Sequence, residues 1–265
     1  MMRISGCLLM GAGLMLAITM RVSAEPLVPP KYEGELIFLR DFGTDEVGYL
    51  SIPKTAPVAG LVVVHGRHGL DPSVRLLCDR LAAEGVLSLA VDLFNGRVPS
   101  NEEEARQCME GTSPQSLQDA IETGVRFFNL SPRFQMQKVV ILSVGENARA
   151  AIAVVRKNKR VSGVTFLDPD VIPAQILVRE MGIPVQVFIS SEKVTSASDS
   201  HQNDSDSESS PHLMRIIRMP EVLYDDPKTF RRTINDRIWP EALSFWSGLD
   251  IPERSITDRI IRSVF

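Results

Sequence analysis

Apolar and polar residues follow two different periods along this chain. Two early segments, Glu35–Arg40 and Glu46–Ile52, alternate apolar and polar residues, which predicts antiparallel strands at the edge of a sheet. The run Ala59–His65 is continuously apolar and β-branched, as expected for a strand buried on both faces. Further strands are predicted at Val86–Val91, Val139–Leu142, Gly163–Leu167, Val185–Ser190 and Leu213–Met219.

Amphipathic segments with helical spacing lie between these strands. Asp71-Pro72 predicts the start of a helix with Val74, Leu77, Cys78, Leu81 and Ala82 on one face, and Gly85 predicts its end. Other helices are predicted from Ser113-Pro114 onward, over Glu146–Lys157 and over Ile234–Trp246. Strands that alternate with helices imply a mostly parallel sheet covered on both faces. Residues 25–265 are therefore predicted to form one three-layer α/β domain.

The first 24 residues resemble a secretory signal peptide. Arg3 gives the positive start, Ile4 to Met20 are mainly apolar, and Val22-Ser23-Ala24 supplies small residues for cleavage before Glu25. This predicts an exported protein, periplasmic or secreted. The alternative is an uncleaved leader that anchors the chain, which is the one membrane contact expected.

Composition and charge narrow the function classes. The chain is 44% hydrophobic and 23% charged with a net charge of −4, which is typical of a globular protein. Removing Arg3 and Arg21 with the leader leaves 27 basic against 33 acidic residues, a net charge of −6. No basic stripe interrupts this balance, so a nucleic-acid partner is not expected. Three cysteines are too few for a disulfide framework; Cys78 is predicted to be a buried thiol, with a Cys78–Cys108 bond as the alternative.

Two segments look peripheral to the core. Residues 195–212 are rich in serine and acidic residues and are predicted to be a disordered loop, with an acidic metal-binding loop as the alternative. In the tail Ser255–Phe265, Ile256, Ile260, Ile261 and Val264 form one helical stripe that is predicted to dock on the body. No sequence motif for a metal site is present, and no cofactor is expected.

The stretch Val62–Arg97 carries a resemblance to a known family. It contains a strand, a glycine loop at Gly66–Gly69, a helix ending in Leu81–Gly85, and a strand ending in Asp92–Phe94. This order resembles the dienelactone hydrolase family of α/β-hydrolases. The similarity continues through Lys138–Ala151 and Ile183–Lys193. The resemblance implies an α/β-hydrolase sandwich and an ester or lactone hydrolase.

Members of that family carry a cysteine or serine nucleophile on a sharp strand-to-helix turn, in a small-x-nucleophile-x-small pattern. In the aligned segment Lys138–Arg149, Gly145 occupies the nucleophile position, Ser143 is the first small residue, and Asn147 stands where glycine is usual. Glycine has no side chain with which to attack. An alternative frame makes Ser143 the nucleophile, but it places the β-branched Ile141 against the turn.

The other two members of the triad are also unmatched. After Val185–Ser190 the family has an acidic residue, and here Glu192-Lys193 is followed by Val194. After the last strand it has a histidine, and Met219–Tyr224 contains none. Asp168 is a candidate for a displaced acid, and a helix or turn cap is its alternative role.

The loops after the first buried strands hold the remaining candidates. In α/β-hydrolases generally, a His-Gly pair in this loop helps to present a backbone N–H to an oxyanion, which His65 and Gly66 match, although the dienelactone hydrolase family has a carboxylate where Gly66 stands. A structural histidine at the strand end is the alternative for His65. Arg67, Arg97 and Arg149 are candidates to converge on the pocket and hold an anion, and a surface charge is the alternative for each. The complete set of pocket candidates is His65, Gly66, Arg67, His68, Arg97, Glu146 and Arg149.

Three functions follow from these features. The first is a catalytically inactive homologue whose old pocket binds a small anionic ligand, or whose surface binds a protein partner. The second is an ester or lactone hydrolase with a rearranged site that uses Ser143 together with His65, His68 or His212. The third is a structural protein of the envelope. The position of Ser143 relative to the turn separates the first two.

Overall fold

The computed structural model describes residues 31–42, 47–169, 182–190, 214–219 and 238–249. The chain divides into residues 1–31 and a compact unit, Tyr32–Phe265, that contains every element described below. The predicted leader, the loop 195–212, the acid position Val194, His201, His212 and the tail Ser255–Phe265 all lie outside the described residues. Within the described residues, no helix combines the length and apolarity that crossing a membrane requires.

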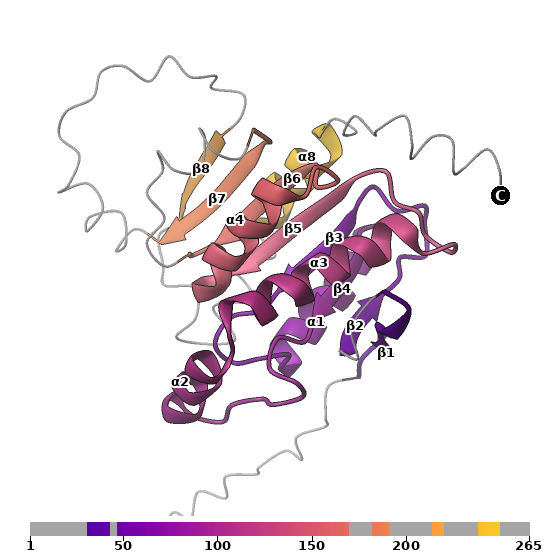
Figure 1. Ribbon diagram of the computed structural model, residues 1–265. Coiled ribbons are helices and arrows are strands. Elements are labelled where there is room, and N and C mark those ends of the chain that lie inside the picture. The colour runs from indigo at the N-terminus through magenta and orange to yellow at the C-terminus, as the bar shows by residue number, and fades with distance from the viewer. Residues whose placement is uncertain (1–30, 43–46, 170–181, 191–213, 220–237, 250–265) are drawn as a thin grey trace, which may run out of the picture. The chain divides into compact units, whose positions relative to one another are not determined.

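The core of the unit is an eight-stranded sheet in the order β1-β2-β4-β3-β5-β6-β7-β8 (Figure 1). Its strands are β1 (Glu35–Phe38), β2 (Val47–Ser51), β3 (Gly60–Val64), β4 (Leu87–Val91), β5 (Val139–Val144), β6 (Gly163–Leu167), β7 (Val185–Ser190) and β8 (Met214–Met219). β2 pairs antiparallel with β1 and β4, and all later pairings are parallel. The prediction of two antiparallel strands at one edge of the sheet and a parallel centre is thereby confirmed.

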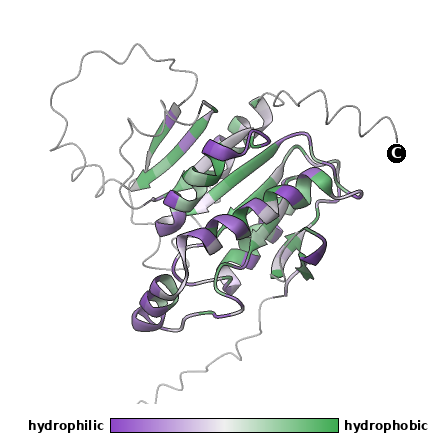
Figure 2. Ribbon diagram, in the orientation of Figure 1, coloured by the Kyte–Doolittle hydropathy of each residue, from purple (hydrophilic) through white to green (hydrophobic). Residues whose placement is uncertain are grey.

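Helices cover both faces of the sheet (Figure 1). They are α1 (Pro72–Ala83), α2 (Glu102–Gly111), α3 (Pro114–Leu130), α4 (Ala148–Lys157) and α8 (Trp239–Gly248). One buried apolar cluster joins the sheet to α3 and α4, and a second joins it to α1 and α8. The strands are mostly hydrophobic while the outward sides of the helices are polar (Figure 2). The predicted three-layer sandwich is confirmed.

The helix boundaries follow from local capping. Asp71 accepts a hydrogen bond from the backbone N–H of Val74 at the start of α1, and Ser113 accepts one from Ser116 at the start of α3. A proline follows each cap, where its missing N–H costs nothing. Gly85 after α1 has φ +85°, the left-handed conformation that favours glycine at a helix end. These signals placed both helices correctly from the sequence.

Two boundaries differ from the prediction, and a third falls outside the described residues. β5 continues to Val144, two residues past the predicted end at Leu142, because Ser143 and Val144 remain paired to the neighbouring strand β6. A 3₁₀ turn, Gly145–Asn147, then precedes α4, which begins at Ala148 rather than at Glu146. The last described helix begins at Trp239; the predicted start at Ile234 lies outside the described residues.

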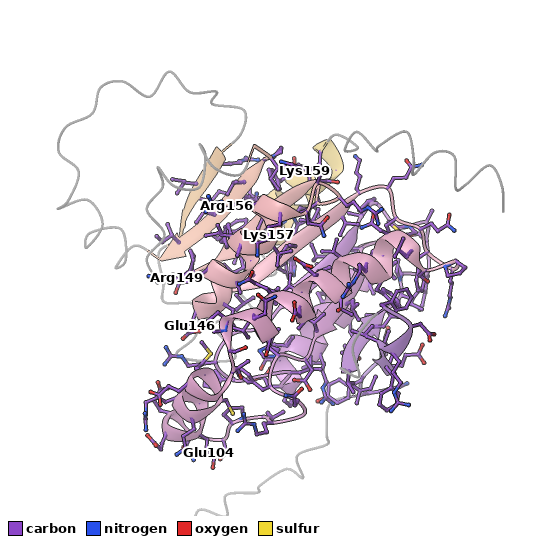
Figure 3. The ribbon with its side chains drawn as sticks, viewed as in Figure 1. Glu104, Glu146, Arg149, Arg156, Lys157 and Lys159 are labelled. Carbon is purple, nitrogen blue, oxygen red and sulfur yellow. The ribbon has the colours of Figure 1, made fainter. Side chains whose placement is uncertain are left out.

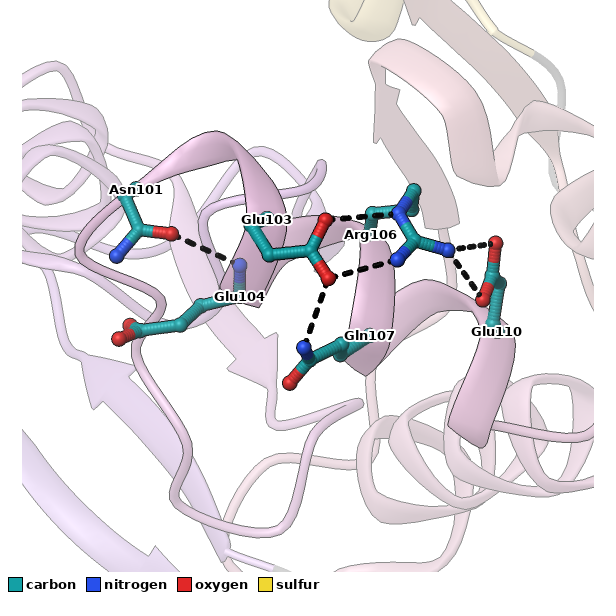
Figure 4. Close-up of polar contacts among 6 residues, drawn as sticks. All are labelled: Asn101, Glu103, Glu104, Arg106, Gln107 and Glu110. Atoms are coloured by element: carbon teal, nitrogen blue, oxygen red, sulfur yellow. Dashed lines mark hydrogen bonds and ion pairs between the residues drawn. The ribbon is translucent and has the colours of Figure 1, made fainter.

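Helix α2 was not predicted at all. Its buried side is narrow, with Ala105 and Cys108 as its buried residues, so it carries little apolar periodicity. Local polar contacts define it instead: Asn101 caps the N–H of Glu104, and Arg106 bonds both Glu103 and Glu110 (Figure 4). Asn101 before three glutamates was the available signal, since acidic residues are favoured in a first helical turn.

Both cysteines of the described chain are buried and free. Cys78 lies on the inner face of α1, as predicted, and burial raises the pKa of its thiol to about 12. The thiolate is therefore strongly disfavoured at neutral pH, which makes Cys78 an inert core residue. The alternative of a Cys78–Cys108 disulfide is not what the structure contains.

Candidate functional site

The candidate site lies where the chain changes direction across the sheet. β3 pairs with both β4 and β5, so the connections that leave the carboxyl ends of β3 and β5 pass to opposite faces. In open α/β sheets such a switch point leaves a crevice in which ligands bind. Here the turns after these two strands meet, because a Cβ built on Gly145 would stand 4.0 Å from the Cα of Gly66.

Gly145 forms the tip of the turn between β5 and α4. Its φ is +66°, a conformation that L side chains rarely adopt and that glycine adopts at almost no cost. A Cβ there would meet only Gly66, so the place of a side chain is open among the described residues. The sharp strand-to-helix turn is thus present, and the residue at its tip has no functional group.

Ser143 lies inside β5 rather than on the turn. It is paired with Val64 on one side and Phe166 on the other, and its exposed fraction is 0%. Its Oγ is buried and has no hydrogen-bond partner within the described residues. A serine nucleophile needs a base within hydrogen-bond reach, and no described imidazole lies within that reach of Ser143.

We expect Ser143→Ala to leave the free energy of unfolding unchanged or to raise it by up to about 1 kcal/mol, because a buried hydroxyl without a partner carries only its desolvation cost. Urea unfolding of the two proteins would measure this. Thr165→Val is the matched control, since Thr165 is a buried hydroxyl that accepts a hydrogen bond from Trp246 Nε1 at 2.9 Å. A clear loss in Ser143→Ala would mean that the Ser143 hydroxyl has a partner.

His65 directly follows β3, and its ring is fully buried with both nitrogens hydrogen-bonded. Its Nε2 accepts a hydrogen bond from the backbone N–H of Leu93 at 3.0 Å, so the neutral ring carries its proton on Nδ1, 2.9 Å from the carbonyl oxygen of Gly66. Phe94 packs edge-on against it, 4.9 Å between ring centres. Burial lowers the pKa of His65 to about 4. Both nitrogens are committed to the backbone, which matches the structural role.

The β3–α1 loop carries an ion-paired cluster. Arg67 Nε donates to Glu146, and Arg67 Nη1 donates to Glu102 of helix α2. The Glu146 side chain is 18% exposed, and its second oxygen lies 3.3 Å from the position of a Cβ on Gly66. A carboxylate thus lies against Gly66, and two carboxylates neutralise Arg67, so Arg67 is poorly placed to hold an anion.

The other candidates do not join this cluster. Arg149 is exposed on the first turn of α4, near Glu146 (Figure 3). Arg97 is exposed and donates from Nε to the carbonyl of Phe94 at 3.5 Å, and His68 is exposed in the β3–α1 loop. Of the predicted set, the structure brings together His65, Gly66, Arg67 and Glu146. Asp168 is buried at the end of β6 with φ +45°, and its N–H bonds the carbonyl of Phe188.

Two residues important for this geometry were missed as site residues. Asn147 donates from Nδ2 to the carbonyl of His65 at 2.7 Å and so connects the two turns; its Oδ1 has no partner among the described residues. The signal was its departure from the family's glycine. Glu102 was missed because it lies on the unpredicted helix α2. Within the described residues, no group of three or more metal-ligating side chains gathers.

Sheet order, the turn after β5 and the histidine-glycine loop after β3 define an α/β-hydrolase. The chain belongs to the dienelactone hydrolase family, whose model matches residues 47–215. The predicted family membership is confirmed.

Solved structures agree on the fold. A putative dienelactone hydrolase from Klebsiella pneumoniae subsp. pneumoniae MGH 78578 has a TM-score of 0.63 at 13% identity, covering 83% of this chain and 100% of that one. The dienelactone hydrolase-like promiscuous phosphotriesterase P91 from metagenomic libraries has a TM-score of 0.60 at 14% identity, covering 83% and 99%. At these identities the likeness concerns fold alone.

Among curated proteins, Protein usf from Aquifex pyrophilus is 29% identical over 79 residues. That match covers 29% of this chain and 34% of the relative, so it spans about a third of the relative's length.

Proposed function

We propose that this chain is an exported, non-hydrolytic member of the dienelactone hydrolase family that uses the scaffold to bind a small ligand or a protein partner. The observation that carries the proposal is Gly145 at the tip of the turn after β5, with φ +66°. Hydrolysis by this family depends on a side-chain nucleophile at that tip, held in a strained conformation. Glycine relieves the strain and supplies no nucleophile.

The neighbouring groups support the same proposal. The hydroxyl of Ser143 is enclosed within β5, where an ester carbonyl has no approach. His65 uses both ring nitrogens for backbone hydrogen bonds, and its pKa of about 4 makes it a weak base. A hydrolase built on Ser143 would need β5 to open and another imidazole to approach.

A fluorophosphonate probe tests the proposal directly, because it labels activated serines. We expect the intact mass of the purified protein to stay unchanged after incubation, and simple aryl esters to remain uncleaved. The same spectrum tests export, because cleavage of the leader would leave a protein with the mass of residues 25–265. A known serine esterase labelled in parallel shows that the probe is active.

The decisive control is Ser143→Ala. One added probe mass that disappears in this variant would identify Ser143 as an activated nucleophile and replace the proposal with the hydrolase hypothesis. An adduct that persists in Ser143→Ala would place a nucleophile elsewhere in the chain, which also contradicts a non-hydrolytic function.

A further inference from the structure

A cavity of about 430 Å³ opens beside the strands β1, β2 and β4, apart from the turn at Gly145. Neither Gly66 nor Gly145 lines it. Its volume lies within the range of about 300–1,000 Å³ that is typical of small-molecule sites. Its walls come from Leu36, Val47, Leu70, Arg75, Asp92, Asn95, Gly96 and Val98.

Strand alternation explains why these residues meet. Leu36 is paired with Tyr49, whose hydroxyl bonds Asp79 on α1, so both side chains point to the α1 face of the sheet. Val47 precedes Tyr49 by two residues and shares that face. Arg75 lies one turn before Asp79 on the same side of α1. The cavity therefore lies between the edge of the sheet and the first turn of α1.

The cavity has apolar walls that the protein core leaves uncovered. Leu36 is 53% exposed and Val98 is 44% exposed, whereas Leu70 beside them is buried. When a ligand covers exposed apolar area around a concave surface and removes it from water, the free energy of the complex is lowered. The walls thus favour a ligand with an apolar body.

Arg75 places a positively charged guanidinium group at the same cavity. Its Nε donates to the carbonyl of Leu70 at 3.2 Å, and its guanidinium carbon lies 5.7 Å from the ring centre of Tyr32. These contacts fix the side chain, and within the described part of the chain no hydrogen bond or ion pair engages its two terminal nitrogens. A guanidinium presented in this way matches the two oxygens of a carboxylate.

Asp92 places a carboxylate at the same cavity. Its two carboxylate oxygens accept hydrogen bonds from the backbone N–H groups of Phe94 and Gly96, at 3.0 and 2.5 Å. These bonds hold the carboxylate in place at the end of β4, where it would repel a second anion. An anionic group in this cavity would therefore be attracted to Arg75 and repelled by Asp92.

From these contacts we infer that the cavity is a binding site for a small carboxylate with an apolar body, with Arg75 holding the carboxylate and Leu36 and Val98 covering the apolar part. The site is separate from the turn at Gly145, so the inference is independent of whether the protein hydrolyses esters. It assigns to Arg75 the anion-holding role that the sequence had suggested for Arg67, Arg97 and Arg149.

Octanoate, octanol and acetate are the probes that test it on the purified protein, by calorimetry for affinity and by amide NMR shifts for location. Octanoate carries both required features, octanol lacks the charge, and acetate lacks the apolar body. We expect octanoate to bind most tightly and to shift the amides of Val47, Leu70 and Gly96. Binding of octanol as tight as that of octanoate, shifts centred on Gly66 and Gly145, or no binding at all would each refute the site.

Arg75→Gln is expected to weaken octanoate binding by about tenfold to a hundredfold, the effect of losing a charge-assisted pair. Arg80→Gln is the matched control, an exposed arginine on the same helix, and should bind octanoate as the unchanged protein does. Leu36→Gln, at a position that is 53% exposed, removes apolar surface without adding charge and should also weaken binding. Equal affinity in Arg75→Gln and Arg80→Gln would overturn the assignment of Arg75.

Discussion

Acidification from pH 7 to pH 4 is expected to remove about 3 kcal/mol of folding free energy through His65 alone. Burial lowers the pKa of His65 from 6.5 to about 4, and each pKa unit corresponds to about 1.4 kcal/mol. The ring is enclosed, Nε2 already accepts from Leu93, and a proton there would break that bond and place a charge in the core.

The direction follows from which state binds the proton. Above pH 6.5 the ring is neutral in the folded and the unfolded chain, so its contribution is complete and independent of pH. Between pH 6.5 and about 4, His65 is protonated in the unfolded chain but stays neutral in the folded chain. The free energy of unfolding therefore falls as the pH falls. Below about pH 4 both states are protonated and the contribution of His65 stays constant.

Urea unfolding at several pH values between 7 and 4 would measure this slope. Carboxylates also titrate near the lower end, so the informative quantity is the difference between the unchanged protein and His65→Gln. We expect the variant to be less stable at pH 7 and to lose less stability on acidification. His68→Gln, an exposed histidine in the same loop, is the control and should follow the unchanged protein. Parallel slopes for all three proteins would show that His65 is not the buried neutral group described.

Replacing Asp79 by alanine is expected to cost about 3 kcal/mol or more of folding free energy, because it leaves buried donors without a partner. The Asp79 carboxylate accepts bonds from the Tyr49 hydroxyl at 2.8 Å, from Ser51 Oγ at 2.5 Å, and from the backbone N–H of Gly34 at 2.9 Å. Tyr49 and Ser51 are almost fully buried. The Asp79 carboxylate on α1 is therefore hydrogen-bonded both to β2 and to the segment that precedes β1.

The size of this loss can be measured by thermal and urea unfolding, with two variants that separate its parts. Tyr49→Phe removes one donor together with its hydroxyl and should cost about 1 kcal/mol. Asp79→Asn keeps the shape and part of the acceptor capacity, so its loss should lie between those of Tyr49→Phe and Asp79→Ala. Asp119→Ala, at a position on α3 whose carboxylate bonds the exposed Gln115, should change stability by less than about 0.5 kcal/mol. An Asp79→Ala loss as small as that of Asp119→Ala would contradict the role of Asp79.

Most of the fold could be predicted from local patterns. Continuous apolar runs marked the central strands, and caps such as Asp71 and Ser113 marked the starts of helices, because both signals act over a few neighbouring residues. Helix α2 could not be predicted from apolar periodicity, because exposed ion pairs rather than an apolar stripe define it. The end of β5 was placed two residues early because its pairing with β6 is a contact between distant segments.

The class of fold, the family resemblance, and the glycine at the position that this resemblance gives to the nucleophile could all be inferred from the amino-acid sequence. Each depends on residue types at fixed spacings along the chain. The burial of Ser143, the hydrogen bonds of both His65 nitrogens, and the pairing of Arg67 with Glu146 and Glu102 became known from the three-dimensional structure. It also placed Arg75 and Leu36 at one cavity. Burial, and the choice of partner for a charge, depend on segments that are distant in the chain, and these come together only when the sheet closes.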